Sequence, residues 1–249
     1  MAVDTVAFSS YVSGNTGTSA THTQEAVVPS GGNGFILIAV HTNDTNAGSP
    51  FTSVTYDGAA FTKLYEWQQN FNSRWNSVWY IRGVAAKTAN IVVTIDTADY
   101  YIFISAAVYS GVDSSSAPDA QSHFSGSSAT STTTDVLTVN EANAWHVAAY
   151  YTHYGRTYAA GSGTTNRGQN ASASEGIADS NGTVSGTHTL NHALTSSTTE
   201  WSTVDVMLNP GTVVVVSDIE AMNGIALADI EAVNGITAAN GEAINGITF

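Results

Sequence analysis

In the segment Phe35-Ile36-Leu37-Ile38-Ala39-Val40 every residue is apolar, and this run is the clearest indication of the fold class. Successive side chains of a β-strand point to opposite faces of the sheet. An unbroken apolar run therefore predicts a strand that is covered on both faces. We expect this segment in the middle of a sheet, with other structure packed on each side.

Runs with β character recur on both sides of this segment, and turn clusters such as Asp57-Gly58 and Asn181-Gly182 separate them. Many short strands with regular turn signals are typical of a sandwich or barrel. No segment has the pattern of an amphipathic helix. The expected strands are Thr5–Val12, Thr23–Val28, Phe35–His41, Phe61–Trp67, Arg74–Arg82, Asn90–Asp96, Tyr100–Tyr109, Asp135–Asn140, Trp145–His153 and Glu200–Leu208.

These patterns predict an all-β protein with a jelly-roll-like antiparallel β-sandwich over residues 1–208 and a C-terminal β-repeat, or strand extension, over residues 209–249. The strand that begins at Trp201 alternates. One face carries Val204, Val206 and Leu208, so we expect the opposite face, with Trp201, Thr203 and Asp205, to contact solvent.

The charge balance excludes several classes of partner. Only 10% of the residues are charged and the net charge is −14. Nucleic-acid binding needs clustered positive charge, which the six basic residues do not supply. An anionic membrane surface is disfavoured for the same reason. We expect neither nucleic acid nor membrane as a partner.

The same sequence bears on cellular location. No run approaches the ~20 apolar residues that span a bilayer. The start, Met1–Val6, lacks the basic and apolar regions of a secretory signal, but virion proteins leave by lysis and need none. The chain has no cysteine, which excludes disulfides and thiolate zinc sites. We expect an extracellular or virion location, with a cytoplasmic one still open.

Part of the chain resembles a known domain. The resemblance is carried by Val54–Leu64, by Val78-Trp79-Tyr80-Ile81, by Ile91–Ile95 and by Ala106–Asp113, which contains Gly111-Val112. Together these segments look like the β-sandwich repeat domain of phage virion and tail proteins and of large bacterial surface proteins. The resemblance covers roughly residues 35–120 and implies a sandwich fold. It carries over no catalytic residue.

The C-terminal residues repeat every eleven positions. Glu220-Ala221-Met222-Asn223-Gly224-Ile225 recurs as Glu231–Ile236 and Glu242–Ile247, with the central variable residue always apolar. Asn-Gly between apolar residues is the strongest short hairpin signal, because a type I′ turn needs positive φ at both positions. Each unit is therefore predicted to pair Met222 with Ile225, or their equivalents.

Three such units predict an assembly element. An isolated hairpin is marginal in water, and strand addition to a sheet edge of another molecule satisfies unpaired backbone. We expect a homo-oligomer or filament. Similar Ile-x-x-Val-Asn-Gly-Ile series look like the tail ends of phage structural proteins. The expected interface residues are Val213, Val215, Ile219, Met222, Asn223, Gly224, Ile225, Ile230, Val233, Asn234, Gly235, Ile236, Ile244, Asn245, Gly246, Ile247 and Phe249.

No catalytic site is expected, because the chain has no Gly-x-Ser-x-Gly, His-Glu-x-x-His or Walker motif. His146 and His153 fall on opposite faces of one strand, and His188 and His192 flank a turn, so structural roles are favoured over metal binding. The protein is predicted to be structural and not an enzyme.

Two kinds of ligand stay open. Oxygen-rich loops at Asn43-Asp44-Thr45-Asn46, at Asp96 with Asp99 and at Asp113 with Asp119 suit a structural Ca²⁺ ion or Asx turns; no other cofactor is expected. Trp67 and Trp75 flank a loop and are the candidate glycan-binding residues. The alternative function is therefore a carbohydrate-binding, lectin-like module of a phage tail or cell-surface protein.

Overall fold

The computed structural model describes most of the chain. The described residues are 3–13, 21–29, 34–43, 48–69, 74–96, 102–115, 117–118, 121–126, 129–134, 136–138, 143–152, 158–170, 175–198 and 200–211, followed by the pairs 221–222, 225–226, 232–233, 236–237, 243–244 and 247–248. The chain folds as two units. We call Ala2–Gly211 the body and Thr212–Phe249 the tail.

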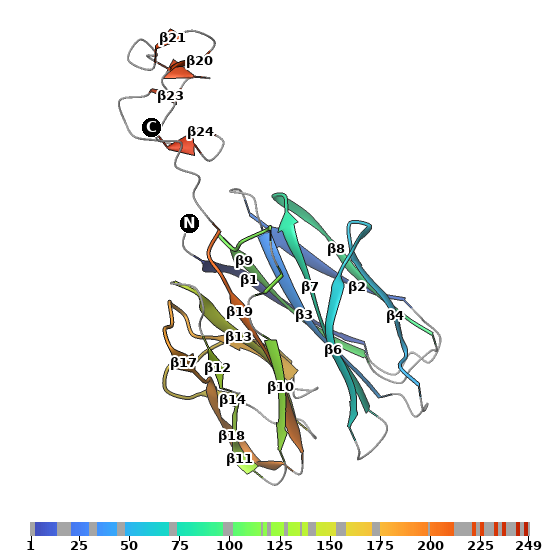
Figure 1. The fold of residues 1–249 in the computed structure, drawn as a ribbon. Coiled ribbons are helices and arrows are strands. Elements are labelled where there is room, and N and C mark those ends of the chain that lie inside the picture. Colours follow the sequence, from blue (N-terminus) through green and yellow to red (C-terminus); the bar gives the residue numbers. More distant parts are fainter. Residues whose placement is uncertain are drawn as a thin grey trace. The chain divides into compact units, whose positions relative to one another are not determined.

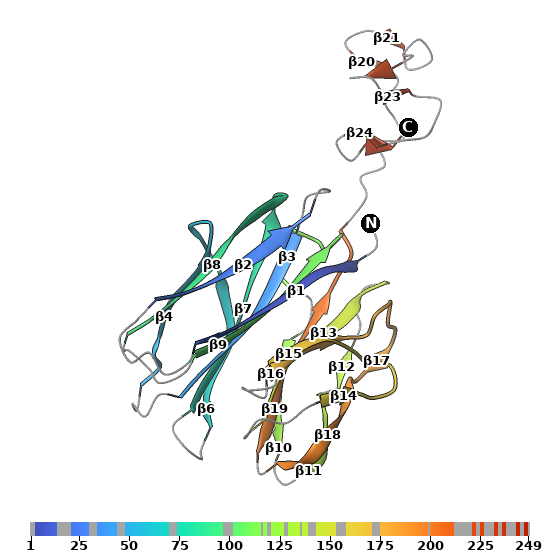
Figure 2. The ribbon, with the colours of Figure 1, turned by 180° about the vertical axis from the view of Figure 1, so that it is seen from behind.

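Every regular element of the described residues is a β-strand, and every strand pair is antiparallel, which confirms the all-β sandwich prediction. In the described part of the body there are four larger sheets and one two-stranded sheet (Figure 1 and Figure 2). Inner sheet 1 consists, in spatial order, of β1 (Asp4–Ser13), β9 (Ile102–Ser110), β3 (Gly34–Asn43), β7 (Arg74–Val84) and β6 (Thr62–Gln69). Outer sheet 1 consists of β2 (Thr21–Val28), β8 (Lys87–Ile95), β4 (Phe51–Tyr56) and β5 (Ala59–Ala60).

The second half of the body repeats this plan. Inner sheet 2 consists of β10 (Gln121–Gly126), β19 (Trp201–Leu208), β13 (Trp145–Thr152), β16 (Glu175–Asp179) and β15 (Thr165–Asn170). Outer sheet 2 consists of β11 (Ala129–Thr133), β18 (Asn191–Thr198) and β14 (Tyr158–Ala160), and the short strands β12 (Leu137–Thr138) and β17 (Thr187–His188) pair beside it.

Three cores join these sheets into four layers. The first lies between outer sheet 1 and inner sheet 1 and includes Tyr56 and Ile91. The second lies between the two inner sheets, where Tyr109 meets Trp145. The third lies between inner sheet 2 and outer sheet 2, around Tyr150. The body is therefore a stack of four sheets, with the two inner sheets packed face to face.

The central position of β3 follows from its sequence. Ile36, Ile38 and Val40 belong to the first core, whereas Phe35, Leu37 and Ala39 belong to the second. All six side chains are at most 1% exposed. Burying an aliphatic or aromatic side chain stabilises a fold by about 1.5–3 kcal/mol. The prediction of a mid-sheet strand covered on both faces is confirmed.

The outer sheets show the complementary pattern. In β2 exposed and buried residues alternate strictly from Thr21 to Val28. His22, Gln24, Ala26 and Val28 point inward, so only one face of the sheet is covered. Alternation is expected of a sheet with one solvated face. The inner strands β13 and β19, by contrast, are buried at every residue.

The expectation of a solvated face on β19 is wrong. Thr203 and Asp205 are 0% exposed and Trp201 is 6% exposed. Asp205 Oδ2 accepts a hydrogen bond from the Thr203 hydroxyl at 3.0 Å, and Asp205 Oδ1 lies 3.1 Å from His146 Nε2. Hydrogen bonds offset the cost of burying these polar side chains. The alternating sequence of β19 therefore did not indicate a solvent-exposed face.

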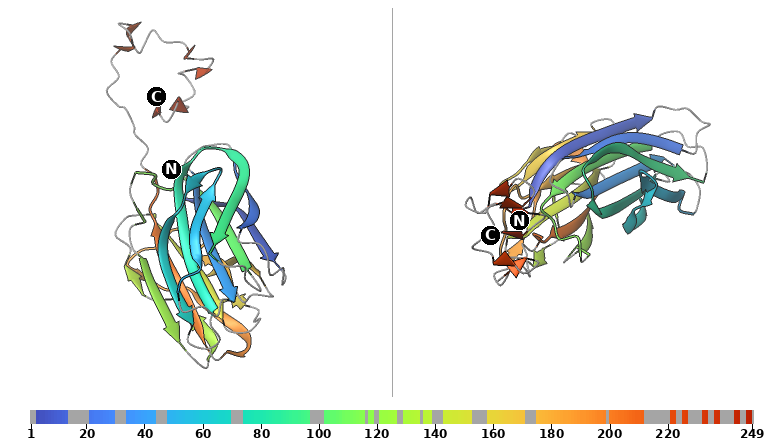
Figure 3. Two further views of the ribbon diagram at one scale, coloured as in Figure 1. Left: turned by 90° about the vertical axis from the view of Figure 1, so that its right-hand side faces the viewer. Right: turned by 90° about the horizontal axis from the view of Figure 1, so that it is seen from above.

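The described residues of the tail form three hairpins: β20 (Ala221–Met222) with β21 (Ile225–Ala226), β22 (Ala232–Val233) with β23 (Ile236–Thr237), and β24 (Ala243–Ile244) with β25 (Ile247–Thr248). These strands are the red arrows in Figure 3. Met222 pairs with Ile225, Val233 with Ile236, and Ile244 with Ile247. The predicted hairpin register is confirmed in all three units.

Candidate functional site

The tail hairpins share one geometry. Each hairpin has two residue pairs: an apolar pair next to the turn position and a second pair farther from it, whose first residue is alanine. The second pairs are Ala221 with Ala226, Ala232 with Thr237, and Ala243 with Thr248. Within the described residues each hairpin is a separate two-stranded sheet. Both strands of such a sheet are edge strands, and an edge strand presents backbone N–H and C=O groups to a further strand.

Six of the predicted interface residues lie in these hairpins, namely Met222, Ile225, Val233, Ile236, Ile244 and Ile247. The others lie outside the described residues; they are Val213, Val215, Ile219, Asn223, Gly224, Ile230, Asn234, Gly235, Asn245, Gly246 and Phe249. Their part in an interface stays a prediction.

The two tryptophans predicted to bind glycans lie on opposite faces of inner sheet 1. Trp67 pairs with Asn76, and Trp75 pairs with Gln68, so the two indoles alternate across the sheet. Trp75 packs partly buried against the first core, whereas Trp67 packs against the second. The structure does not bring the two rings together. Glycan binding at either ring stays a prediction.

Trp67 belongs to an aromatic cluster at the edge where β6 faces β10. The His123 ring stacks on Tyr65 with centroids 4.4 Å apart, and its centroid lies 4.8 Å from that of Trp67. Tyr151 meets Trp67 edge-on at 4.9 Å. Burial lowers the pKa of His123, so its imidazole is neutral at pH 7.

A pocket of about 210 Å³ opens beside this cluster. We call it the seam pocket. It is lined by Trp67 and Gln68 of β6, by His123 and Ser125 of β10, by Glu200, and by Trp201 and Ser202 of β19. The indole of Trp201 lies across Gly126, where a Cβ atom would approach its ring to 2.6 Å. Of these residues only Trp67 was a sequence-based candidate, because the others become neighbours only when the two inner sheets pack.

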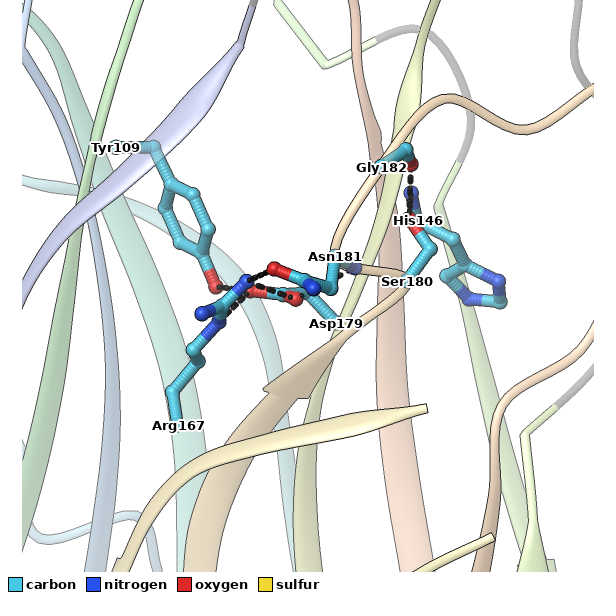
Figure 4. Close-up of polar contacts among 7 residues, drawn as sticks. All are labelled: Tyr109, His146, Arg167, Asp179, Ser180, Asn181 and Gly182. Carbon is cyan, nitrogen blue, oxygen red and sulfur yellow. Dashed lines mark hydrogen bonds and ion pairs between the residues drawn. The ribbon is translucent and has the colours of Figure 1, made fainter. Parts of the chain in front are cut away.

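A cluster of hydrogen-bonded polar side chains connects the two inner sheets (Figure 4). Arg167 donates from Nε and Nη2 to the two carboxylate oxygens of Asp179, at 2.6 and 2.8 Å. Tyr109 of inner sheet 1 donates its hydroxyl to Asp179 Oδ2 at 3.1 Å. Burial, followed by the charge of Asp179, raises the pKa of Tyr109 well above its usual range. The cluster has a structural role, since its hydrogen bonds engage both carboxylate oxygens of Asp179.

The structure places His146 next to His188, which belongs to a different strand. His146 Nδ1 lies 3.1 Å from His188 Nδ1, and His146 Nε2 faces Asp205. His192 instead packs against Tyr150 and Tyr158 with centroids 4.6 and 5.5 Å away. His153 lies outside the described residues. Within the part of the chain that the structure describes, no three His, Asp or Glu side chains are grouped as a metal site requires.

The oxygen-rich loops are only partly described. Asp44, Asn46, Asp99 and Asp119 lie outside the described residues, as does the side chain of Asn43. Asp113 Oδ1 accepts hydrogen bonds from the backbone N and the hydroxyl of Ser115, at 2.9 and 2.7 Å. This is the geometry of an Asx turn. Calcium binding stays a prediction. No helix among the described elements is long and apolar enough to cross a membrane.

Comparison with known proteins gives little similarity. No protein-family model matches the chain, and no curated protein is similar to it. Among solved structures, the major capsid protein P2 from bacteriophage PM2 aligns with 83% of this chain and 98% of its own chain, at 10% sequence identity and a TM-score of 0.23. A TM-score this low does not establish a common topology. The described elements make the chain an all-β protein, and these comparisons show no family for it.

Proposed function

We propose that this chain is a structural, non-enzymatic protein that assembles with copies of itself, the tail hairpins adding strands to neighbouring subunits. The product is a filament or a surface lattice, outside the cell or on a virion. The body supplies a rigid four-layer block, and the tail supplies the connection.

One observation carries this proposal: three hairpins of identical register recur at an eleven-residue interval. Each strand has only two residues. A hairpin of that length forms few backbone hydrogen bonds, and an isolated two-stranded hairpin is marginally stable in water. Pairing with a strand of another subunit adds hydrogen bonds and apolar contacts that each hairpin lacks by itself.

The tail also has a charge that bears on assembly. Residues 212–249 contain five acids, Asp218, Glu220, Asp229, Glu231 and Glu242, and no Lys or Arg. Like charges that face each other in a sheet are destabilising. Assembly through this tail is therefore expected to strengthen with ionic strength, because salt screens exposed charges.

Deletion of the tail tests the proposal. The body is a compact unit by itself, so a chain that ends at Gly211 is expected to fold. We expect assemblies of the full chain in light scattering and negative-stain electron microscopy, and monomers after truncation. Assemblies of unchanged size after truncation would rule out the tail as the assembly element.

A matched pair of full-length variants separates turn formation from general damage. Replacing Gly224, Gly235 and Gly246 by Val opposes the positive φ that an Asn-Gly type I′ turn requires. The control is Gly48→Val, since Gly48 is exposed and a Cβ there meets nothing within 4 Å. The triple variant should lose assembly, whereas the control should keep it.

A further inference from the structure

We propose that His146 and His188 form an acid-sensitive contact, which holds β17 against inner sheet 2 at neutral pH and releases it when both imidazoles are protonated. We call these two residues the histidine pair. Their Nδ1 atoms lie 3.1 Å apart, and the two rings meet edge to face with centroids 5.3 Å apart. Both residues belong to the body, so the proposal is independent of assembly through the tail.

The hydrogen bonds around His146 fix the tautomer of both rings at neutral pH. A carboxylate only accepts hydrogen bonds, so His146 donates from Nε2 to Asp205 Oδ1, 3.1 Å away. The Nδ1 atom of a neutral His146 is then an acceptor, and His188 donates to it from its own Nδ1. The Thr203 hydroxyl donates to the other carboxylate oxygen at 3.0 Å. A connected series of three hydrogen bonds therefore joins β19, β13 and β17.

The contact between the two Nδ1 atoms has room for one proton. One proton added to the histidine pair leaves the hydrogen bond intact, because one of the two Nδ1 atoms still has a free lone pair. A second added proton makes both atoms donors, so that two N–H groups point at each other over 3.1 Å. The rings then also carry like charges. The contact is therefore lost when both rings are protonated.

The surrounding charges oppose the second proton. Among the described residues, Asp205 is the titratable group that faces the histidine pair. The acidic side chains of β16, Glu175 and Asp179, form hydrogen bonds to inner sheet 1 on the opposite face of their sheet, and Arg167 pairs with Asp179 there. On β18, His192 packs against two tyrosines instead. One carboxylate neutralises one imidazolium, and a second imidazolium has no counter-charge.

The titration of His188 agrees with this geometry. Burial, followed by the charge of His146, lowers the pKa of His188 below the ordinary 6.5. A histidine with a lowered pKa in the folded state contributes stability that is complete above pH 6.5 and is lost as pH falls from there. Release of β17 is therefore expected below about pH 6.5.

The segment that the histidine pair controls is short. Among the described residues, β17 pairs with β12 over two positions. The backbone is anchored on both sides: Val184 N donates to Ala144 O at 3.0 Å, and Leu190 N donates to the Thr134 hydroxyl at 2.7 Å. An opening between these anchors breaks few contacts, so residues 185–189 can separate from inner sheet 2 while the rest of the body stays folded.

The test uses the full chain and hydrogen–deuterium exchange with mass spectrometry at pH 7.5 and at pH 5. Dividing the intrinsic exchange rates by the measured ones gives protection factors, which remove the chemical effect of pH. His188→Asn is the matched variant, because its amide can donate to or accept from His146 and does not titrate. His192→Phe is the control, since it removes a neighbouring buried histidine and leaves the histidine pair intact.

In the parent chain and in His192→Phe, protection of peptides that cover residues 184–190 should fall about tenfold between pH 7.5 and pH 5, as expected for loss of a buried hydrogen bond. His188→Asn should keep its protection, and its difference from the parent should be confined to this segment. Three results would overturn the proposal: the parent keeps its protection at pH 5, His188→Asn loses as much as the parent, or His192→Phe abolishes the loss.

Discussion

Arg167 and Asp179 form a two-point ion pair, 2.6 and 2.8 Å long, in which the carboxylate side chain is fully buried between the inner sheets. Tyr109 of inner sheet 1 donates to the same carboxylate. The pair therefore holds β15 and β16 together and anchors inner sheet 2 to inner sheet 1 (Figure 4).

Removing the guanidinium should strongly destabilise the body. Arg167→Ala leaves a buried carboxylate without its counter-charge, a change that typically costs about 3–5 kcal/mol. Urea unfolding at pH 7 measures the loss. Lys63→Ala is the control, because it breaks the more exposed ion pair with Glu66 and should change stability by about 1 kcal/mol at most. Equal effects of the two substitutions would contradict the assignment of Asp179 as a buried structural anchor.

Glu175 should make the body less stable as pH rises. Burial raises its pKa well above the usual range, partly offset by the hydrogen bond at 3.0 Å from the Ser105 hydroxyl. A carboxyl with a raised folded-state pKa binds more protons in the folded state. Its contribution to stability is complete below the unfolded-state pKa and is lost as pH rises toward the folded-state pKa. Glu175→Gln should flatten the fall in unfolding free energy above about pH 5. A variant with the parent's slope there would contradict this.

His192 should act in the opposite direction. Burial lowers its pKa to about 4 from the ordinary 6.5, so the folded protein holds it neutral. The unfolded chain takes up a proton below pH 6.5, and stability is lost as pH falls from there toward pH 4. The full shift corresponds to about 3 kcal/mol. His192→Phe should remove most of this acid sensitivity in chemical unfolding between pH 7 and 4.5. If the unfolding free energy of the variant falls between pH 7 and 4.5 as steeply as that of the parent, another group is responsible for the acid sensitivity.

The tail carboxylates should oppose assembly. Replacing Glu220, Glu231 and Glu242 by Gln removes like charges that recur at the repeat interval. We expect larger assemblies at low ionic strength and a weaker response to added salt, both measured by light scattering. Smaller assemblies in this variant would mean that the carboxylates bind the neighbouring subunit instead of repelling one another.

Much of the fold could be predicted from residue patterns. The burial of β3 on both faces and the hairpin register of the tail were predicted correctly, because period-two patterning and turn chemistry act over a few residues. Strands β10 and β11 and the strands from β14 to β18 were not among those predicted. Their segments are rich in Gly, Asn, Ser and Thr, and such residues form strands here only through pairing with more apolar neighbours.

Most residues that line the seam pocket could not be predicted from the sequence. Trp67 and Trp75 were expected to flank one loop, but the register of β6 against β7 places their side chains on opposite faces of the sheet. His123, Glu200 and Ser202 join Trp67 only because the two inner sheets pack face to face. Such a contact depends on packing over long sequence distances, which local patterns do not encode.

Strand pairing between tails of different subunits can be measured by hydrogen–deuterium exchange of the tail, followed by mass spectrometry across about a hundredfold range of protein concentration. Strand addition between subunits obeys mass action. Peptides that cover residues 221–248 should therefore exchange more slowly as concentration rises, while peptides of the body keep their rates. Tail exchange that is the same at every concentration would contradict intermolecular strand pairing.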